Sequence, residues 1–117
     1  MPRNINRRYV QDMEFAIWGV KKNAKWTFNK PENKPYLRSV FETSTVSGNE
    51  RTNHPTQKSL ELMRQIIRIH TNPGDVILDP FMGSGTTGVA ALMENRKFFG
   101  IEVNPDYFEL SIKRIKA

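Results

Sequence analysis

The stretch DPFMGSGTTG at residues 79–88 combines an aspartate with three glycines in a pattern suited to ligand binding. Asp79 precedes Gly83, Gly85 and Gly88, whose G-x-G-x-x-G spacing often marks a loop that holds the pyrophosphate of a dinucleotide. In such a loop the glycines let the backbone approach the ligand. The helix that follows offers N–H groups and a partial positive charge.

The carboxylate at the mouth of this loop argues against a phosphate ligand. If Asp79 stood about 5 Å from one phosphate charge, the repulsion would be roughly 3 kcal/mol at an effective dielectric constant of about 20. S-adenosylmethionine has an ammonium, a sulfonium, a carboxylate and no phosphate, so the loop favours this cofactor over NAD. The alternative is that Asp79 only forms the turn or caps the helix at the end of a strand.

Glu102 lies at the end of the next apolar segment, where an acid can accept two hydrogen bonds from ribose hydroxyls. NAD sites use the same feature, so Glu102 does not distinguish the two cofactors. A solvated loop acid is the other interpretation of this residue.

The elements that would position these acids follow from the spacing of apolar residues. Pro55 suits the first position of a helix, and Asn104 can cap another. The predicted elements are a helix over 56–71, a strand over 76–78, a helix over 86–95, a strand over 98–103 and a helix from Pro105. This order predicts an α/β fold in which parallel strands are joined by a right-handed crossover, the partial Rossmann-like arrangement with flanking helices.

The first half of the chain is less regular. Residues 15–20 and 26–28 have the composition of strands and are separated by a basic turn, which predicts an amino-terminal β-hairpin. Trp18 and Trp26 are interpreted as packing residues of this hairpin. Residues 29–53, rich in Pro, Asn, Ser and Lys, are predicted to form a long loop.

Length and composition set limits on these predictions. The 117 residues make one small domain at most, and doubly wound α/β enzymes usually need more, so the chain could be a piece of a larger protein. It has no cysteine, which excludes disulfides and cysteine-based zinc sites. No segment resembles a signal peptide, and no apolar run approaches the roughly 18 to 20 residues that span a bilayer. We therefore expect no membrane association.

All of the excess positive charge lies in the first half. Residues 1–58 hold 11 Lys and Arg against 5 Asp and Glu, a net charge of +6, whereas residues 59–117 hold 7 of each. This asymmetry favours a surface for a polyanion such as duplex DNA, although a solvated basic face is the alternative. The candidate phosphate contacts are Arg3, Arg7, Arg8, Lys21, Lys22 and Lys25.

Three motifs in sequence order carry a resemblance to a known family. HPTQK at 54–58, the glycine loop at 79–88 and GIEVNPDYFE at 100–109 resemble the carboxyl-terminal part of DNA amino-methyltransferases of the permuted (beta) group. These enzymes transfer a methyl group from S-adenosylmethionine to the exocyclic amino nitrogen of adenine or, less often, of cytosine. The resemblance is strong over 54–117 and less distinctive over 1–53.

The resemblance implies roles for single residues. His54, Thr56 and Lys58 would lie at the methionine end of the cofactor, and Glu102 would bind its ribose with Asn104 beside it. The residues implied to line the loop are Asp79, Phe81, Gly83, Ser84, Gly85, Thr86 and Thr87. Ser59 stands where the family usually has proline, a mild departure because proline there mainly pre-sets the first helical turn. His70 lies outside the motifs and is interpreted as structural.

The family's catalytic tetrapeptide, Asp/Asn/Ser-Pro-Pro followed by an aromatic residue, is missing from the sequence. Residues 79–82 have the acid and one proline but lead straight into the glycine loop. Residues 104–107 lack the second proline and are better explained as the start of a helix. No catalytic residue is therefore assigned, and we expect this chain alone to be an incomplete and inactive part of an adenine-directed enzyme.

The strand that carries the tetrapeptide in this family lies beside the strand at 76–78. The resemblance thus implies that an amino-terminal part, or a second copy of the chain, completes the sheet. We expect two regions: a basic hairpin and loop segment over 1–53 and a cofactor-binding half of a methyltransferase domain over 54–117. Such an enzyme would work in the cytoplasm of a bacterium, encoded by the host or a phage. The alternatives are a non-catalytic DNA-binding or assembly module with a vestigial loop, and a fragment of a nucleotide-binding oxidoreductase.

Overall fold

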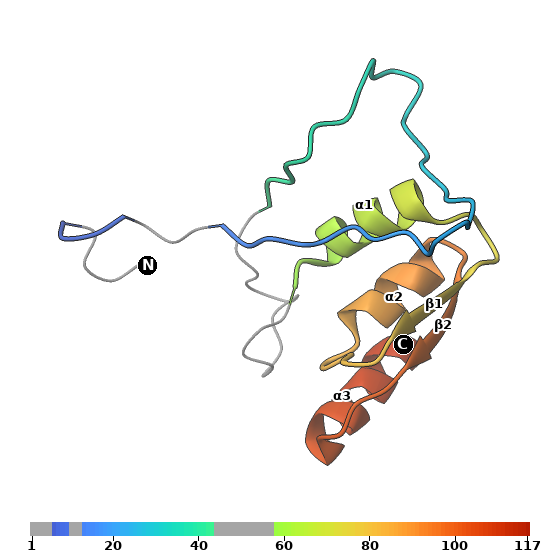
Figure 1. The fold of residues 1–117 in the computed structure, drawn as a ribbon. Coiled ribbons are helices and arrows are strands. Elements are labelled where there is room, and N and C mark those ends of the chain that lie inside the picture. The colour runs from blue at the N-terminus through green and yellow to red at the C-terminus, as the bar shows by residue number, and fades with distance from the viewer. Residues whose placement is uncertain (1–5, 10–12, 44–57) are drawn as a thin grey trace.

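A computed structural model of the protein describes residues 6–9, 13–43 and 58–117, and all of its helices and strands lie in the last of these ranges. The elements in chain order are α1 (Leu60–His70), β1 (Val76–Asp79), α2 (Thr86–Met93), β2 (Lys97–Gly100) and α3 (Pro105–Lys116). Figure 1 shows α2 between α1 and α3, with the two strands running beside it. The predicted order of helices and strands is confirmed.

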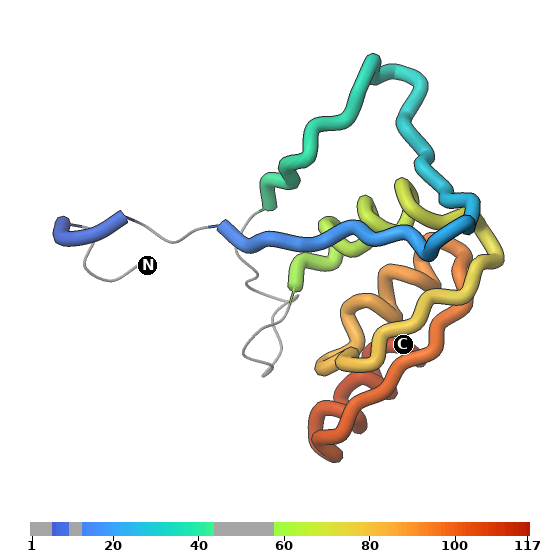
Figure 2. Tube along the Cα trace, in the orientation of Figure 1, coloured from blue at the N-terminus to red at the C-terminus, as the bar shows by residue number. Residues whose placement is uncertain are grey.

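The two strands pair in parallel, as the α/β prediction requires. Val76 lies opposite Lys97, and Asp79 lies opposite Gly100. Both strands therefore end at the same edge of the sheet, which brings the segments that follow them side by side (Figure 2). Parallel strands need a crossover connection, and α2 with its flanking loops provides it.

All three helices cover one face of this sheet. The core consists of Ile67 from α1 and Ala90 and Ala91 from α2, which allow the two helices to approach closely. Ile77 from β1 and Phe98 from β2 pack against this core from the sheet. Because successive residues of a strand point to opposite faces, the neighbours of Ile77 and Phe98 project away from the helices.

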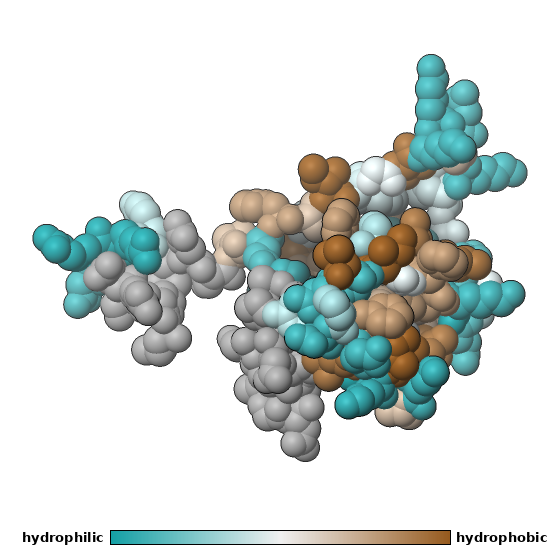
Figure 3. Space-filling view, turned by 90° about the horizontal axis from the view of Figure 1, so that it is seen from below, coloured by the Kyte–Doolittle hydropathy of each residue, from teal (hydrophilic) through white to brown (hydrophobic). Residues whose placement is uncertain are grey.

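The apolar neighbours, together with two residues that follow β2, form a surface that we name the bare face: Val76, Leu78, Phe99, Ile101 and Val103. Each of the five is exposed, with Leu78 61% and Phe99 62% accessible to solvent. Seen from below, the surface of the molecule also carries hydrophobic side chains scattered among hydrophilic ones (Figure 3). Parallel sheets normally have both faces covered, whereas the described helices lie on only one side of this sheet.

Element boundaries differ from the predictions at several ends. Helix α1 begins at Leu60 instead of Thr56, because the hydroxyl of Ser59 accepts a hydrogen bond from the Leu62 amide at 3.3 Å and caps the helix. Pro55 and Thr56 lie outside the described residues. Ser59 thus starts the helix in the place where proline was expected from the family pattern.

The other boundaries also move by a few residues. Helix α2 ends at Met93 and not at Asn95, whose φ of 62° is left-handed. Strand β2 is Lys97–Gly100 in place of 98–103. The cap predicted for α3 is confirmed, because the Asn104 side chain accepts hydrogen bonds from the amides of Asp106 and Tyr107 at 2.9 and 3.1 Å.

The predicted amino-terminal hairpin is wrong for the part of the chain described. A turn forms where the amide of Ala24 donates to the carbonyl of Lys21 at 3.0 Å, yet residues 13–43 contain no strand. The segment that enters the turn instead runs extended beside α1 (Figure 1). Strand composition alone was misleading here, because a strand also needs a neighbour that pairs with its backbone.

Asn29, which follows the turn, attaches this part of the chain to the carboxyl end of α1 through both its backbone and its side chain. The Asn29 amide N–H donates to the carbonyl of Ile69 at 2.7 Å, and the Asn29 side chain donates to the carbonyls of Arg68 and Thr71 at 3.0 and 2.8 Å. These carbonyls belong to a helix end, where backbone acceptors lack partners within the helix. Asn29, which is far from α1 in the sequence, thus donates hydrogen bonds to the carbonyls at the end of this helix.

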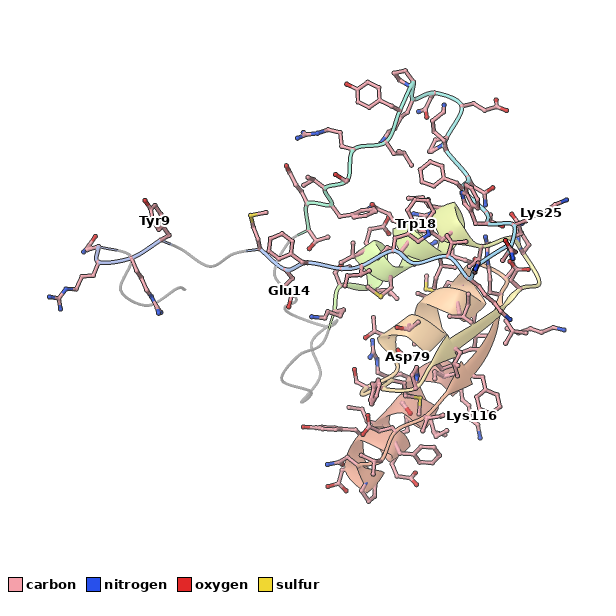
Figure 4. The ribbon with its side chains drawn as sticks, viewed as in Figure 1. Tyr9, Glu14, Trp18, Lys25, Asp79 and Lys116 are labelled. Carbon is pink, nitrogen blue, oxygen red and sulfur yellow. The ribbon has the colours of Figure 1, made fainter. Side chains whose placement is uncertain are left out.

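An aromatic cluster adds to this attachment. The rings of Trp18 and Phe28 stack with centroids 5.6 Å apart, and His70 lies 4.9 Å from Trp18 and 5.8 Å from Phe28. Figure 4 shows Trp18 close to α1. The packing role predicted for Trp18 and the structural role predicted for His70 are confirmed, although the cluster replaces the expected hairpin. Trp26 is largely exposed.

Two helices are joined by a charged network around Glu94, at the end of α2. Its carboxylate accepts hydrogen bonds from Arg64 at 2.7 Å and from Arg68 at 3.0 Å, and the Glu94 side chain is only 11% exposed. Burial by itself would raise the pKa of Glu94, but the hydrogen bond from Arg64 and the charges of Arg68 and Arg64 outweigh it and hold the pKa below its ordinary value of 4.5.

Among the residues described, no helix is both long enough and apolar enough to cross a membrane.

The Glu94 network predicts a pH-dependent stability. Because the pKa of Glu94 is lower in the folded chain than its ordinary value of 4.5, its contribution is complete well above pH 4.5 and is lost as the pH falls toward the folded pKa. Glu94→Gln should lower the free energy of unfolding by about 1–3 kcal/mol at pH 7. Urea unfolding should show this difference shrinking below pH 4.5. Glu109→Gln, on an exposed position of α3, is the control, and an equal loss in both variants would contradict the prediction.

Candidate functional site

The loop between β1 and α2 lies at the edge where both strands end. Asp79 is the last residue of β1, and its Oδ1 accepts a hydrogen bond from the Phe81 amide at 3.0 Å. Figure 4 shows Asp79 at this turn, below the start of α2. The carboxylate therefore helps to form the turn, as one interpretation of the sequence held, and it remains half-exposed at the mouth of the loop.

Two of the glycines have left-handed backbone angles. Gly83 has a φ of 55° and Gly85 a φ of 88°, a region that favours glycine. A Cβ atom on Gly85 would also lie 2.9 Å from the Cβ atom of Ser111 in α3. Gly88 is packed in the same way, since its Cβ would lie 2.7 Å from the ring of Phe98. Gly85 and Gly88 thus serve close packing against the protein itself.

Glu102 ties the loop to the segment after β2. Its Oε1 accepts a hydrogen bond from the Gly83 amide at 2.9 Å, and its Oε2 accepts one from the Asn104 amide at 2.9 Å. The Met82 amide also donates to the Ile101 carbonyl at 3.0 Å. The carboxylate is held by one backbone amide on each oxygen, which fixes its plane. This excludes the interpretation of Glu102 as a freely solvated loop acid.

The hydroxyl side chains of the loop point into the protein. Ser84 and Thr86 are 3% and 5% exposed, and both accept hydrogen bonds from Arg114 of α3, at 2.9 and 3.0 Å. The Thr87 hydroxyl contacts the Met63 sulfur at 3.8 Å. Any contact of these three residues with a ligand would therefore have to come mainly from their backbone.

A family model described as DNA methylase matches residues 1–113. The chain belongs to this family.

The chain is similar in sequence or structure to three DNA methyltransferases. The crystal structure of the M1.HpyAVI–SAM complex superposes with a TM-score of 0.90 at 62% identity, covering 100% of this chain and 57% of that one. Type II methyltransferase M2.DpnII of Streptococcus pneumoniae is 50% identical over 124 residues, 97% of this chain and 46% of the relative. DNA adenine methyltransferase YhdJ of Escherichia coli (strain K12) is 50% identical over 66 residues, 56% of this chain and 22% of the relative.

These comparisons confirm the family and the fold class expected from the sequence. They also show that the chain spans only about half of the first two relatives, although nearly all of it is matched. The partial methyltransferase fold seen in the structure is therefore the counterpart of a larger fold in M1.HpyAVI.

The remaining residues predicted for this DNA methylase site lie around the loop or outside the description. Phe81 is 87% exposed beside Asp79, and the Asn104 side chain is engaged in capping α3. Lys58 forms an ion pair with Glu14 of the extended segment, at 2.9 Å. His54 and Thr56 lie outside the described residues, so their predicted contacts remain predictions.

The basic residues proposed for DNA are all exposed where they are described: Arg7, Arg8, Lys21, Lys22 and Lys25. Arg3 lies outside the described residues. Figure 4 shows Lys25 projecting from the turn that follows the extended segment.

Sequence reasoning missed Arg114 as part of the site. Arg114 lies in the last turn of α3, where any basic residue suits the negative end of the helix dipole. Nothing in its spacing from the loop, 30 residues earlier in the chain, indicates that it contacts Ser84. Only the packing of α3 beside the start of α2 brings the two together.

Proposed function

We propose that the protein is the cofactor-binding part of a DNA methyltransferase that transfers a methyl group from S-adenosylmethionine to an exocyclic amino nitrogen, with adenine favoured. One observation carries the proposal. Asp79 ends β1 and Glu102 follows the adjacent parallel strand β2, so the two acids flank one glycine loop, and Glu102 accepts a hydrogen bond from the Gly83 amide. A relative of 62% identity with the same fold is described as a complex with SAM. Adenine is favoured because the name of YhdJ specifies it. An enzyme of this kind would work where bacterial DNA is, in the cytoplasm.

The chemistry of the site suits this cofactor. Glu102 is oriented by two backbone amides and would accept hydrogen bonds from ribose hydroxyls, with Asn104 beside it. Asp79 adds a second negative charge at the loop, which attracts a cationic ligand and repels a diphosphate. When bound, S-adenosylmethionine supplies an electrophilic methyl group on its sulfonium. Phe81 and the backbone of Gly83–Thr87 would line the same site.

The other end of the cofactor would be held from the start of α1. His54, Thr56 and Lys58 are the proposed contacts. Lys58 already neutralises Glu14, so the ion pair would place one cation and one anion near the methionine end. Both side chains are substantially exposed, which leaves them accessible to a ligand.

Cofactor binding can be tested by removing only the charge of Asp79. In Asp79→Asn the side-chain oxygen can still accept from Phe81, so the turn should remain while attraction to the cofactor falls. We expect calorimetry to show S-adenosylmethionine binding to the chain, weakened about tenfold in this variant, equivalent to about 1.4 kcal/mol. Asp75→Asn is the matched control, because Asp75 accepts from the Asn72 amide before the opposite end of β1.

NAD and S-adenosylhomocysteine complete this experiment. The proposal expects S-adenosylhomocysteine to bind and NAD to bind weakly or not at all. Tighter binding of NAD than of S-adenosylmethionine would overturn the choice of cofactor and favour the oxidoreductase alternative.

Catalysis requires residues beyond those of this chain. An exocyclic amino group is a poor nucleophile because its lone pair is delocalised into the ring, so the base must be flipped out and its amino group held. The Pro-Pro-aromatic tetrapeptide that would hold it is missing from the sequence. We propose that a second polypeptide, the amino-terminal part of a methyltransferase, supplies it; a second copy of the chain lacks the tetrapeptide as well and would only complete the sheet.

The bare face supports the need for this partner. Burying one large apolar side chain contributes roughly 1.5–3 kcal/mol, and a whole domain is stable by only about 5–15 kcal/mol. The exposed bare-face residues, which include Leu78 and Phe99, therefore forgo burial free energy that is substantial compared with the stability of a whole domain. Among the described residues β2 is also the only strand paired with β1, so the other edge of β1 can accept a further strand.

A charge on the bare face should prevent this association. Leu78→Asp replaces an exposed side chain, so it should change the isolated chain little, yet it would bury a carboxylate on assembly. With the part of M1.HpyAVI that this chain does not match, we expect the wild-type chain to form a complex in sedimentation and to methylate duplex DNA. Leu78→Asp should do neither, whereas Tyr36→Asp, an exposed position outside the sheet, should behave like wild type.

The outcomes of this experiment distinguish a part of a methyltransferase from a non-catalytic assembly module. A complex that forms but transfers no methyl group would favour the non-catalytic assembly module. A well-folded monomer that ignores the added part would contradict the proposed partner.

The exposed basic residues are proposed to contact DNA phosphates. Such contacts add affinity without sequence information, and each one contributes about 0.9 to the slope of log K against log salt concentration. Lys22→Ala combined with Lys25→Ala should therefore lower that slope by about 2 in a fluorescence titration with duplex DNA. Lys113→Ala combined with Lys116→Ala, at exposed positions of α3, is the control. Binding to duplex DNA that does not weaken as the salt concentration rises would contradict the proposed phosphate contacts.

A further inference from the structure

One arginine reaches the glycine loop from the helix behind it. Arg114 lies in the last turn of α3, and its Nη1 donates to the carbonyl of Ser84 at 2.9 Å, to the hydroxyl of Ser84 at 2.9 Å and to the hydroxyl of Thr86 at 3.0 Å. Both hydroxyls are almost fully buried. Nη1 has two N–H groups, so one of them is shared between two acceptors, and this single nitrogen contacts one backbone and two side-chain oxygens of the loop.

We propose that Arg114 is a positioning residue of the cofactor site, which holds the glycine loop in its binding conformation before the ligand arrives. The inference rests on the proposed function, because it assigns the loop to the cofactor. It concerns the contacts between the loop and α3, whereas the two acids lie at the end of β1 and after β2. Arg114 would act through the backbone of Ser84 and Gly85 and would not touch the cofactor itself.

The loop needs such support because of its backbone. Gly83 and Gly85 adopt left-handed angles, and glycine loses more conformational freedom on ordering than any other residue. If the loop were ordered only on binding, that cost would reduce the affinity for the ligand; ordering it in advance removes the cost from the binding step. Contacts that immobilise residues 83–86 without occupying the ligand side therefore raise affinity.

The geometry supplies these contacts from two directions. On one side the Gly83 amide is bonded to Glu102, which follows β2. On the other side Arg114 holds Ser84 and Thr86, and Ser111, one turn earlier in α3 and fully buried, lies against Gly85. The loop is thus clamped between the segment after β2 and the inner face of α3.

Charge placement indicates that Arg114 serves more than helix stability. At the end of α3 a cation is favourable, but the same cation lies at the start of α2, where the helix dipole is positive. Its contacts with the loop offset that repulsion. Arginine suits this position because its planar guanidinium directs N–H groups at fixed angles, whereas a lysine is a flexible point charge.

A matched pair of arginines allows a test that separates positioning from general stability. Arg96 is also buried, and it holds the carbonyl of Thr71 at 2.7 Å and the hydroxyl of Thr71 at 2.9 Å, at the other end of α1 and α2. Arg114→Met and Arg96→Met should both lower stability to urea. Only Arg114→Met should speed hydrogen exchange of the amides of residues 79–88 relative to the rest of the chain, by about tenfold, equivalent to about 1.4 kcal/mol in local opening.

The cofactor provides a second readout. We expect Arg114→Met to weaken S-adenosylmethionine binding about tenfold in calorimetry, Arg114→Lys to restore part of the loss, and Arg96→Met to leave the affinity unchanged. Ser84→Ala removes one of the acceptors with little risk to folding. It should loosen the loop in the same direction, and combining it with Arg114→Met should add less than the separate effects predict.

The results distinguish this inference from the proposed function. Equal loop exchange in Arg114→Met and Arg96→Met would overturn the positioning role, whether or not the cofactor binds. If Arg114→Met does not fold, unchanged loop exchange in Ser84→Ala overturns it instead. Failure of the wild-type chain to bind S-adenosylmethionine would count against the proposed function, while the exchange measurement would still decide the role of Arg114.

Discussion

The parallel pairing of β1 and β2 is the interaction on which the rest of the structure depends. It places Asp79 opposite Gly100, so that the glycine loop after β1 and Glu102 after β2 leave the sheet at the same edge. The Gly83–Glu102 hydrogen bond and the Met82–Ile101 hydrogen bond are possible only because of this register. A shift of one residue would move Ile77 and Phe98 out of the core and separate the two acids from each other.

The helices turn this small sheet into a one-sided structure. Small residues make the close contacts: Ala90 and Ala91 let α1 approach α2, and Gly85 and Gly88 let α3 and β2 approach the start of α2. Polar contacts then fix the ends, with Glu94 joining α1 to α2 and Arg114 joining α3 to the loop. Nothing comparable covers the bare face among the described residues, which agrees with a chain that spans 57% of M1.HpyAVI.

The described part of the amino-terminal segment also depends on contacts with α1, although it contains no helix or strand. Asn29 satisfies carbonyls at the end of α1, the rings of Trp18 and Phe28 enclose His70, and Lys58 pairs with Glu14 near the start of α1. An extended chain with exposed apolar side chains, such as Phe15 and Ile17, is thereby held along one helix. The segment is extended, and among the described residues it pairs with no strand.

The sequence by itself determined the order of elements, the glycine loop, the cap at Asn104 and the family, because apolar periodicity, glycine spacing and capping residues are local features. It also predicted that Asp79 and Glu102 would share one site, since parallel strands end at a common edge. The tertiary structure decided what depends on distant partners. It replaced the hairpin by a segment bound to α1, directed the hydroxyls of Ser84 and Thr86 to Arg114 instead of outward, and left one sheet face exposed. These outcomes follow from contacts between residues about 30 to 50 positions apart, which no local pattern encodes.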